Sequence, residues 1–567
     1  MADIVKTLLE LSKLPTGNEE FGEWLKFQDV QQFLLANRTS DNFILYGSLQ
    51  YAFVYSVAVP AASVNPPDIE DLIDWDCDPT TGWGVAIQPT QPPRVWVEPP
   101  LHGSRSDTLK AGEQLLFHRD FEGRIGPKKS YVELLQKFTQ ILGIHYLTER
   151  KAYCRLDEHG DIEEIVRIID VAERGEHYGG TIITCNRKVL DKFLALTDAA
   201  IVQMFDFTRF RTSHFHGWKG DRERHVLDAD LFWNWHIEPG YAGYIRGCQV
   251  VRPQISKQQA AMEDSPFGQD KEKQYTSFIA FDWKHDIVQE ISCSPDSLAN
   301  YFTESDLPFE TTPAFFKPGV LSKYKADPDK YTITQRSITC RGAWHLQTYD
   351  INEAGQVHTY LVYLQHLPYE EQLYWKSYNE RPKGTLSKRA IKTDFEGDWD
   401  LEYDALESLK DHLGTLNRNQ VPWWTIRSKG LLERVQYPAT TAAGEWANEL
   451  LLLDQLVVEG FETKWLRKKA QEMGRPIQES MGSLKLSEEY LTGLGFAGAE
   501  QVLSPLKTLH GLRSKLKGHA SGDEALTITK LALEEAGTFR AHYKSLCQQC
   551  DESMRTIARV FAEKPDK

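Results

Sequence analysis

The stretch LRSKLKGHAS, at residues 512–521, combines an arginine, two lysines and a histidine in ten positions. Neither Asp nor Glu occurs between Gln501 and Gly522, although the whole chain carries a net charge of −16. An imidazole can accept or donate a proton near neutral pH, and a guanidinium can hold two phosphate oxygens at once. Arg513 and His519 therefore predict a site that binds a phosphate and transfers protons beside it.

These two side chains suffice for cleavage of RNA through a 2′,3′-cyclic phosphate, because the ribose 2′-hydroxyl supplies the nucleophile. DNA lacks this hydroxyl and cannot react in this way. The chemistry needs no metal and no cofactor, and RNA is the expected partner. Six further residues are expected to support the site or to contact RNA, and they are Ser514, Lys515, Lys517, Lys507, Arg467 and Lys468.

The residues around this stretch predict a helix that ends at the site. Leucines recur at three- and four-residue steps, which is typical of a buried helical stripe. They are Leu503, Leu506, Leu509, Leu512 and Leu516. Gly518 can end this helix, and Ser521 with Glu524 forms a capping-box pattern that begins the next one. His519 is then expected in the short connection, beside a helix N-terminus that favours an anion.

The spacing of Arg513 and His519, at the turn before the last helix of a C-terminal helical bundle, resembles the Arg-x(4–6)-His motif of the HEPN superfamily. Many members of that family are metal-independent ribonucleases of toxin and phage-defence systems, and they generally act as dimers. The resemblance covers residues 436–567 and implies an endoribonuclease that forms a homodimer through this bundle. One position departs from the family, since Ser514 follows the arginine where Asn, Asp or His is common.

The organisation of the chain predicts an α+β protein, in which a large mixed body precedes an all-α bundle. Residues 1–40 are expected to form N-terminal helices, and residues 41–365 an α+β body of one or two domains that senses a trigger or selects the substrate. Residues 366–435 are expected to be an aromatic and charged connector, and residues 436–567 to be the bundle. The trigger at the body would be a protein or a small molecule.

Local patterns predict several individual elements. A single helix is expected over 130–147, a hairpin with Gly160 at its tight position, and a strand, a helix and a strand over 181–207. In the bundle we expect about four helices, among them one over 444–473, one over 499–518 and one continuous helix over 521–563.

Composition indicates a folded, soluble protein, with 41% hydrophobic and 26% charged residues. The N-terminal residues 1–20 contain Asp3 and no long apolar core, and the longest apolar stretch, near Pro60, is too short to span a bilayer. Eight cysteines in 567 residues do not suggest a disulfide framework. We therefore expect a cytoplasmic protein without membrane contact.

Other interpretations of the same residues remain open. Arg513 and His519 can simply complement the dipole at a solvated helix end. The bundle can be a non-catalytic RNA-binding or dimerisation module, and the N-terminal body can itself be an enzyme. Two further groups of residues could hold a metal but are expected to pack instead, namely His214, His216, His225 and His236 in one segment and Cys547 with Cys550 in the last helix.

Overall fold

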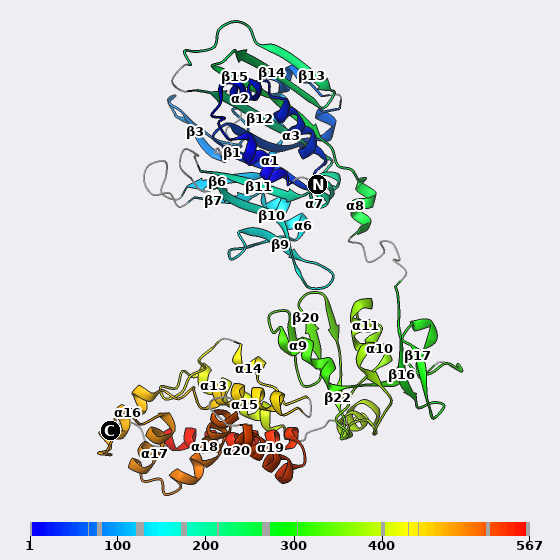
Figure 1. The fold of residues 1–567 in the computed structure, drawn as a ribbon, viewed down its shortest axis with the longest axis vertical. Coiled ribbons are helices and arrows are strands. Elements are labelled where there is room, and N and C mark those ends of the chain that lie inside the picture. The colour runs from blue at the N-terminus through cyan, green and yellow to red at the C-terminus, as the bar shows by residue number, and fades with distance from the viewer. Residues whose placement is uncertain are drawn as a thin grey trace. The chain divides into compact units, whose positions relative to one another are not determined.

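The computed structural model divides the chain into two compact units (Figure 1). The first comprises Met1–Asp157 and Ile162–Lys271, and the second comprises Glu158–Asp161 and Glu272–Lys567. The structure describes residues 3–65, 67–75, 82–120, 130–171, 179–211, 215–263, 273–302, 304–398, 403–428, 430–439, 442–516 and 522–562. Within these ranges, every helix is too short or too polar to cross a membrane.

Strands dominate the first unit. They are β1 (Asn42–Leu49), β2 (Ala52–Pro60), β3 (Gly84–Gln88), β4 (Arg94–Glu98), β5 (Glu113–Gln114), β6 (Leu116–Asp120), β7 (Ser130–Leu134), β8 (His145–Leu147), β9 (Ala152–Leu156), β10 (Ile162–Val171), β11 (Gly180–Asn186), β12 (Ala199–Phe210), β13 (Glu223–Asp228), β14 (Leu231–Glu238) and β15 (Ala242–Val251). The main sheet is antiparallel, in the order β13-β14-β15-β12-β2-β1-β11-β10-β9-β8, with β5 beside β2. Two hairpins, β3–β4 and β6–β7, stand apart from it.

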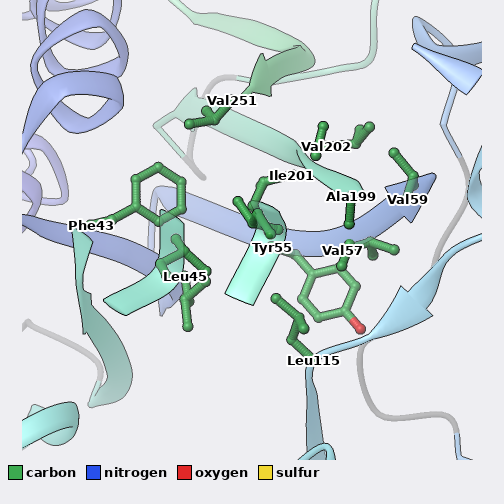
Figure 2. Close-up of a cluster of buried hydrophobic side chains, with 14 of the residues drawn as sticks. Phe43, Leu45, Tyr55, Val57, Val59, Leu115, Ala199, Ile201, Val202 and Val251 are labelled. Atoms are coloured by element: carbon green, nitrogen blue, oxygen red, sulfur yellow. The ribbon is translucent and has the colours of Figure 1, made fainter. Parts of the chain in front are cut away.

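Helices cover both faces of this sheet. They are α1 (Ile4–Leu11), α2 (Asn18–Trp24), α3 (Gln28–Thr39), the 3₁₀ turn η1 (Ala61–Ser63), α4 (Ile69–Leu72), α5 (Asp107–Lys110), α6 (Gln136–Leu142), α7 (Arg187–Leu196) and α8 (Lys257–Glu263). Successive strand residues point to opposite faces. On β1, Phe43 and Leu45 join the core on one face (Figure 2), to which α6 and α7 also contribute side chains. Ile44 packs with α1 and α3 on the other face.

The second unit begins with a smaller mixed region. Its strands are β16 (Ser277–Asp282), β17 (Ile287–Ser292), β18 (Pro313–Phe316), β19 (Tyr331–Ile333), β20 (Ile338–Cys340), β21 (Trp344–Leu346), β22 (Asp350–Ile351), β23 (Val357–Tyr360) and β24 (Asn379–Glu380). Its helices are η2 (Pro295–Ser297), η3 (Pro318–Leu321), α9 (Ser322–Ala326), α10 (Leu361–Leu364), α11 (Tyr369–Tyr378), α12 (Lys388–Ala390) and the π-helical turn η4 (Ile391–Phe395). One sheet has the order β17-β16-β18-β23-β22, and β19, β20 and β21 form another.

A helical bundle completes the second unit. Its helices are α13 (Ala405–Arg418), α14 (Leu431–Arg434), α15 (Ala443–Val457), α16 (Thr463–Glu472), α17 (Ser483–Gly493), α18 (Ala499–Ser514), α19 (Gly522–Ala536) and α20 (Phe539–Ala562). All of them contribute side chains to a single hydrophobic core. The chain therefore has an α+β fold with a C-terminal run of helices, as the sequence predicts.

The two units do not follow the boundaries of the four ranges proposed from the sequence. Helices α1 and α3 belong to the first unit, and residues 41–365 are shared between both units. The range 366–435 is no mere connector, because Trp375 lies in the core of the mixed region and Leu406 in the core of the bundle. The bundle thus begins at α13 and contains more helices than the four expected.

Several predicted elements are confirmed. Strand β11, helix α7 and strand β12 follow one another over 180–210. Strands β9 and β10 pair in an antiparallel hairpin, and Gly160 adopts a left-handed φ of 74°. Helix α18 carries the expected stripe, in which Leu503, Leu506 and Leu509 are fully buried.

Three predicted helices are wrong in extent. The range 130–147 forms β7, α6 and β8, since Val132 and Leu134 pair with β6 and Gly143 ends α6 with a φ of 60°. The range 444–473 is split into α15 and α16 at Gly460, which lies against the Trp424 indole with no room for a side chain. The range 521–563 contains two helices, α19 and α20, separated at Gly537 with a φ of 74°.

Candidate active site on helix α18

The centre of the candidate site is a buried carboxylate on α15, the helix that packs beside α18. Asp454 is the one charged residue in a mostly apolar run, LLLLDQLVV, and its side chain is 0% exposed. The imidazole Nδ1 of His510 on α18 lies 3.1 Å and 3.3 Å from its two carboxylate oxygens. A buried carboxylate needs such partners, because burial without them is costly. Asp454 therefore fixes the orientation of the His510 ring.

This contact decides which nitrogen of His510 is free to react. A carboxylate only accepts hydrogen bonds, so Nδ1 carries the proton that His510 donates to Asp454. The other nitrogen, Nε2, makes no hydrogen bond to any residue in the described ranges, and the side chain is 47% exposed. His510 thus combines a fixed tautomer with a nitrogen that can take up or release a proton.

The predicted arginine joins the same carboxylate from the next turn of α18. Arg513 Nε lies 3.7 Å from Asp454 Oδ2, and Arg513 Nη2 lies 3.4 Å from Glu459 Oε1. Residues three apart on a helix share a face, so His510 and Arg513 present an imidazole and a guanidinium side by side. The Arg513 side chain is 32% exposed. Solvent and ligands can therefore reach it.

The pKa of the Asp454 carboxyl group reflects its burial and its charged neighbours. Burial raises the pKa of this carboxyl group above its ordinary value, while the contacts with His510 and Arg513 lower it and the charge of Glu459 raises it further. The two cationic partners thus oppose the effect of burial. The Asp454 carboxylate is thus a buried group with two basic partners, His510 and Arg513, and not an ion pair at the surface.

The other predicted residues fall into two groups, those outside the described ranges and those with partners elsewhere in the bundle. His519 and Lys517 lie outside the described residues, as do Gly518 and Ser521, so the predicted connection is not described. Ser514 is the last residue of α18. Lys515 Nζ lies 3.3 Å from Glu524, and Lys507 Nζ lies 2.6 Å from Glu488. Both lysines thus pair with carboxylates of this chain.

The two predicted cations on α16 serve the bundle itself. Arg467 donates hydrogen bonds to the backbone carbonyls of Gln478, Glu479 and Met481, and thereby holds the segment before α17. Lys468 is mostly exposed, and its Nζ lies 4.0 Å from Glu472 on the same helix. Among the predicted cations that lie in the described ranges, Arg513 alone joins the cluster at Asp454.

The sequence interpretation missed two members of this cluster, His510 and Asp454. A histidine three residues before the arginine on the same helical face was one available signal. A single carboxylate inside a run of leucines and valines was the other, because a charge at a buried position calls for a partner. Neither signal identifies the partner, since the two residues are 56 positions apart.

The other candidate groups do not form a metal centre in the described part of the chain. His214 lies outside it. His225 Nε2 lies 3.4 Å from Glu223, and His236 Nε2 lies 2.9 Å from Glu238, so these histidines have different partners. The described ranges contain no group of three or more His, Cys, Asp or Glu side chains arranged to hold a metal.

The expected packing of the cysteine pair on α20 is confirmed. Cys547 and Cys550 are free thiols buried in the core of the bundle. Burial raises the pKa of both thiols, so they stay protonated and unreactive at neutral pH.

Comparison with models of protein families, with curated proteins and with solved structures finds no match to this chain.

Proposed function

We propose that the protein is a metal-independent endoribonuclease whose site is built around His510 and Arg513. The observation that supports this proposal is the shared contact of both side chains with the buried carboxylate of Asp454. A proton-transfer group with a fixed tautomer, next to a guanidinium, is the minimal equipment for attack by a ribose 2′-hydroxyl.

In the proposed reaction, His510 Nε2 takes the proton of the 2′-hydroxyl as its oxygen attacks phosphorus. The bond between phosphorus and the 5′-oxygen breaks, which leaves a 2′,3′-cyclic phosphate and a 5′-oxygen that receives a proton. Arg513 binds the nonbridging oxygens while their charge grows. Asp454 contacts neither substrate nor reacting atoms and acts as a positioning residue.

RNA must compete with Glu459 for the guanidinium of Arg513. This ion pair is long, at 3.4 Å, and both side chains are partly exposed. Pairs of this kind stabilise a protein by at most about 1 kcal/mol. A phosphate that forms two parallel hydrogen bonds with the guanidinium gains more than this. Exchange of Glu459 for a phosphate is therefore favourable.

The second proton-transfer step needs a second group. His519 is one candidate, and His510 of another copy of the chain is the other, since a symmetric dimer brings two identical sites together. By its resemblance to the HEPN family, the bundle would form this homodimer, and the protein would act in the cytoplasm as an effector of phage defence or of a toxin system. The first unit would then sense a protein or small-molecule trigger.

A second candidate function is a non-catalytic RNA-binding or dimerisation module. The ion pairs of Lys507 with Glu488 and of Lys515 with Glu524 favour the dimerisation module over an RNA-binding one, because these cations are already neutralised within the chain. Binding of RNA backbone normally uses cations that are free to replace its counterions.

Incubation of the purified protein with total RNA in excess EDTA separates the two functions. The nuclease yields fragments that end in a 2′,3′-cyclic phosphate or in the monophosphate formed by its hydrolysis. If the protein is a non-catalytic module, the RNA stays intact, whether or not it binds to the protein. His145→Ala is the matched control for His510→Ala and should leave cleavage unchanged. His145 is an exposed histidine on β8 of the first unit.

A further inference from the structure

A pocket of about 490 Å³ opens on the sheet of the mixed region, away from the bundle site. Four of its residues, Phe281, Val288, Pro313 and Phe315, come from β16, β17 and β18. In the register of the sheet, Phe281 pairs with Val288, and Pro313 and Phe315 pair with residues of β23. Paired residues of an antiparallel sheet share a face, so one face of this sheet forms the floor of the pocket.

The opposite face of the same sheet packs into the core of the mixed region. Phe278, Ala280, Ala314 and Phe316 alternate with the pocket residues along β16 and β18 and are fully buried there. The part of the sheet that forms the floor of the pocket is thus apolar, and the described residues leave the volume above it unfilled. Apolar volume of this size is typical of a ligand site.

A separate segment, residues 382–395, forms the cover of the pocket. Pro382, Gly384, Thr385 and Leu386 line it from one end. Ile391 and Phe395, the first and last residues of the π-helical turn η4, also line it. Such π-helical turns are rare and occur often at functional sites.

Hydrogen bonds fasten this cover to the strands beneath it. Asn352 Nδ2 donates to the Thr385 carbonyl at 3.0 Å, and the Ser387 backbone N–H donates to His358 Nε2 at 3.1 Å. At the other end, the Tyr360 hydroxyl donates to Asp394 at 3.0 Å. The pocket is therefore held open by the fold, which reduces the cost of ordering on binding.

The lining indicates the chemistry of an occupant. All eleven lining residues are uncharged, so an ion would lose its hydration without gaining a counter-charge. Four of the eleven are aromatic, on the floor and in the cover, and Trp283 meets Phe395 edge-on with ring centroids 5.9 Å apart. Flat rings pack best against other flat rings.

We infer that this pocket binds an uncharged, planar aromatic small molecule. The inference is independent of the nuclease proposal, because it rests on other residues and on another part of the second unit. The pocket would give the protein a small-molecule ligand in the same unit as the bundle.

The test uses the full chain and the uncharged fluorescent naphthalene ketone prodan. Prodan should bind in a saturable manner with a blue-shifted emission, and the aliphatic ketone 2-nonanone should displace it poorly. The anionic naphthalene 1-anilinonaphthalene-8-sulfonate should bind at least about tenfold more weakly, since its charge has no partner in the pocket. Equal binding of the two naphthalenes would overturn the inference.

Two matched variants place the binding in this pocket. Ile391→Asp puts a charge on the lining and should weaken prodan binding by about tenfold or more. Ile287→Asp changes a comparably exposed isoleucine on β17 outside the lining, at 46% against 37% exposed, and should leave binding unchanged. Equal losses in the two variants, or no loss in Ile391→Asp, would contradict the inference. Circular dichroism in the near ultraviolet serves as the check of folding for both variants.

Discussion

The carboxylate of Asp454 on α15 accepts a hydrogen bond from the His510 imidazole on α18 at 3.1 Å, although Asp454 is fully buried and His510 is half exposed. The pair therefore connects the core of the bundle to its surface. A rigid, buried acceptor below an exposed imidazole is an arrangement that fixes a reactive nitrogen. Arg513 extends it by a guanidinium one turn further along α18.

The first prediction distinguishes the two histidines. His510→Ala should reduce cleavage of RNA by about a hundredfold or more, which is typical for loss of a general base. The melting temperature should also fall, because the buried Asp454 carboxylate loses its hydrogen-bond partner, so the rates are compared well below the melting temperature of the variant. His519→Ala, measured in parallel, shows whether the second proton-transfer group comes from the same chain. Full activity of His510→Ala would exclude this histidine from the reaction.

The second prediction concerns the arginine. Arg513→Lys keeps the charge, so salt-matched affinity for RNA should stay within a few-fold. Only arginine offers two parallel donors to a phosphate, and loss of an oriented donor costs about a hundredfold or more in rate. Single-turnover rates beside binding curves provide the comparison. If the lysine variant cleaves as fast as the wild type, Arg513 contributes only its positive charge to the surface and has no specific role in the reaction.

The third prediction tests the break between the last two helices. Gly537 has a φ of 74°, where a Cβ atom is disfavoured, so Gly537→Ala should lower the free energy of unfolding by about 1 kcal/mol. Gly511 lies inside α18 with open space around a Cβ atom, and Gly511→Ala should instead raise it by about 0.5–1 kcal/mol. Urea denaturation measures both. Effects of the same sign would contradict this geometry.

The fourth prediction concerns stability at acid pH. The pKa of His358 is lowered to about 4, mainly by burial. The charge of Arg389 lowers it as well, whereas the charges of Asp350 and Asp394 raise it. Between about pH 6.5 and 4 the unfolded chain then binds more protons at this residue than the folded chain does. Its contribution to stability is present above pH 6.5 and is lost on acidification, by up to about 1.4 kcal/mol per pH unit.

His358→Gln isolates this contribution, because a glutamine carbonyl can accept the hydrogen bond that His358 Nε2 accepts from Ser387 and does not titrate. The difference in unfolding free energy between wild type and variant should shift in favour of the variant as pH falls from 7 to 5. A difference that does not depend on pH would show that His358 titrates normally.

The sequence was most informative where a pattern is local. The leucine stripe of α18 reflects burial of one face of the helix, and it appears in the structure. The break at Gly460 was not visible, because its cause is the indole of Trp424, which packs against that glycine from a distant part of the chain. The break at Gly537 had a local cause, but the polar residues around it suited one long helix equally well.

The candidate site could likewise be predicted from the sequence only in part. Arg513 stands out by its charge and by the absence of nearby carboxylates in the sequence. The carboxylates that it contacts, Asp454 and Glu459, come from α15 and the residues after it, which only the packing of the bundle brings to α18. The connection that contains His519 is outside the described residues, so that part of the sequence hypothesis stays a prediction.

The central claim is that Asp454 positions His510 and Arg513 for cleavage of RNA. The most direct measurement is the single-turnover cleavage rate in EDTA of Asp454→Asn beside Asp551→Asn. Asp551 is likewise buried in the bundle but contacts Tyr403, Ser408 and Arg555 instead. We predict a loss of about a hundredfold for Asp454→Asn and a rate within a few-fold of wild type for Asp551→Asn. Rates that fall equally in the two variants, or that do not fall in Asp454→Asn, would contradict the claim.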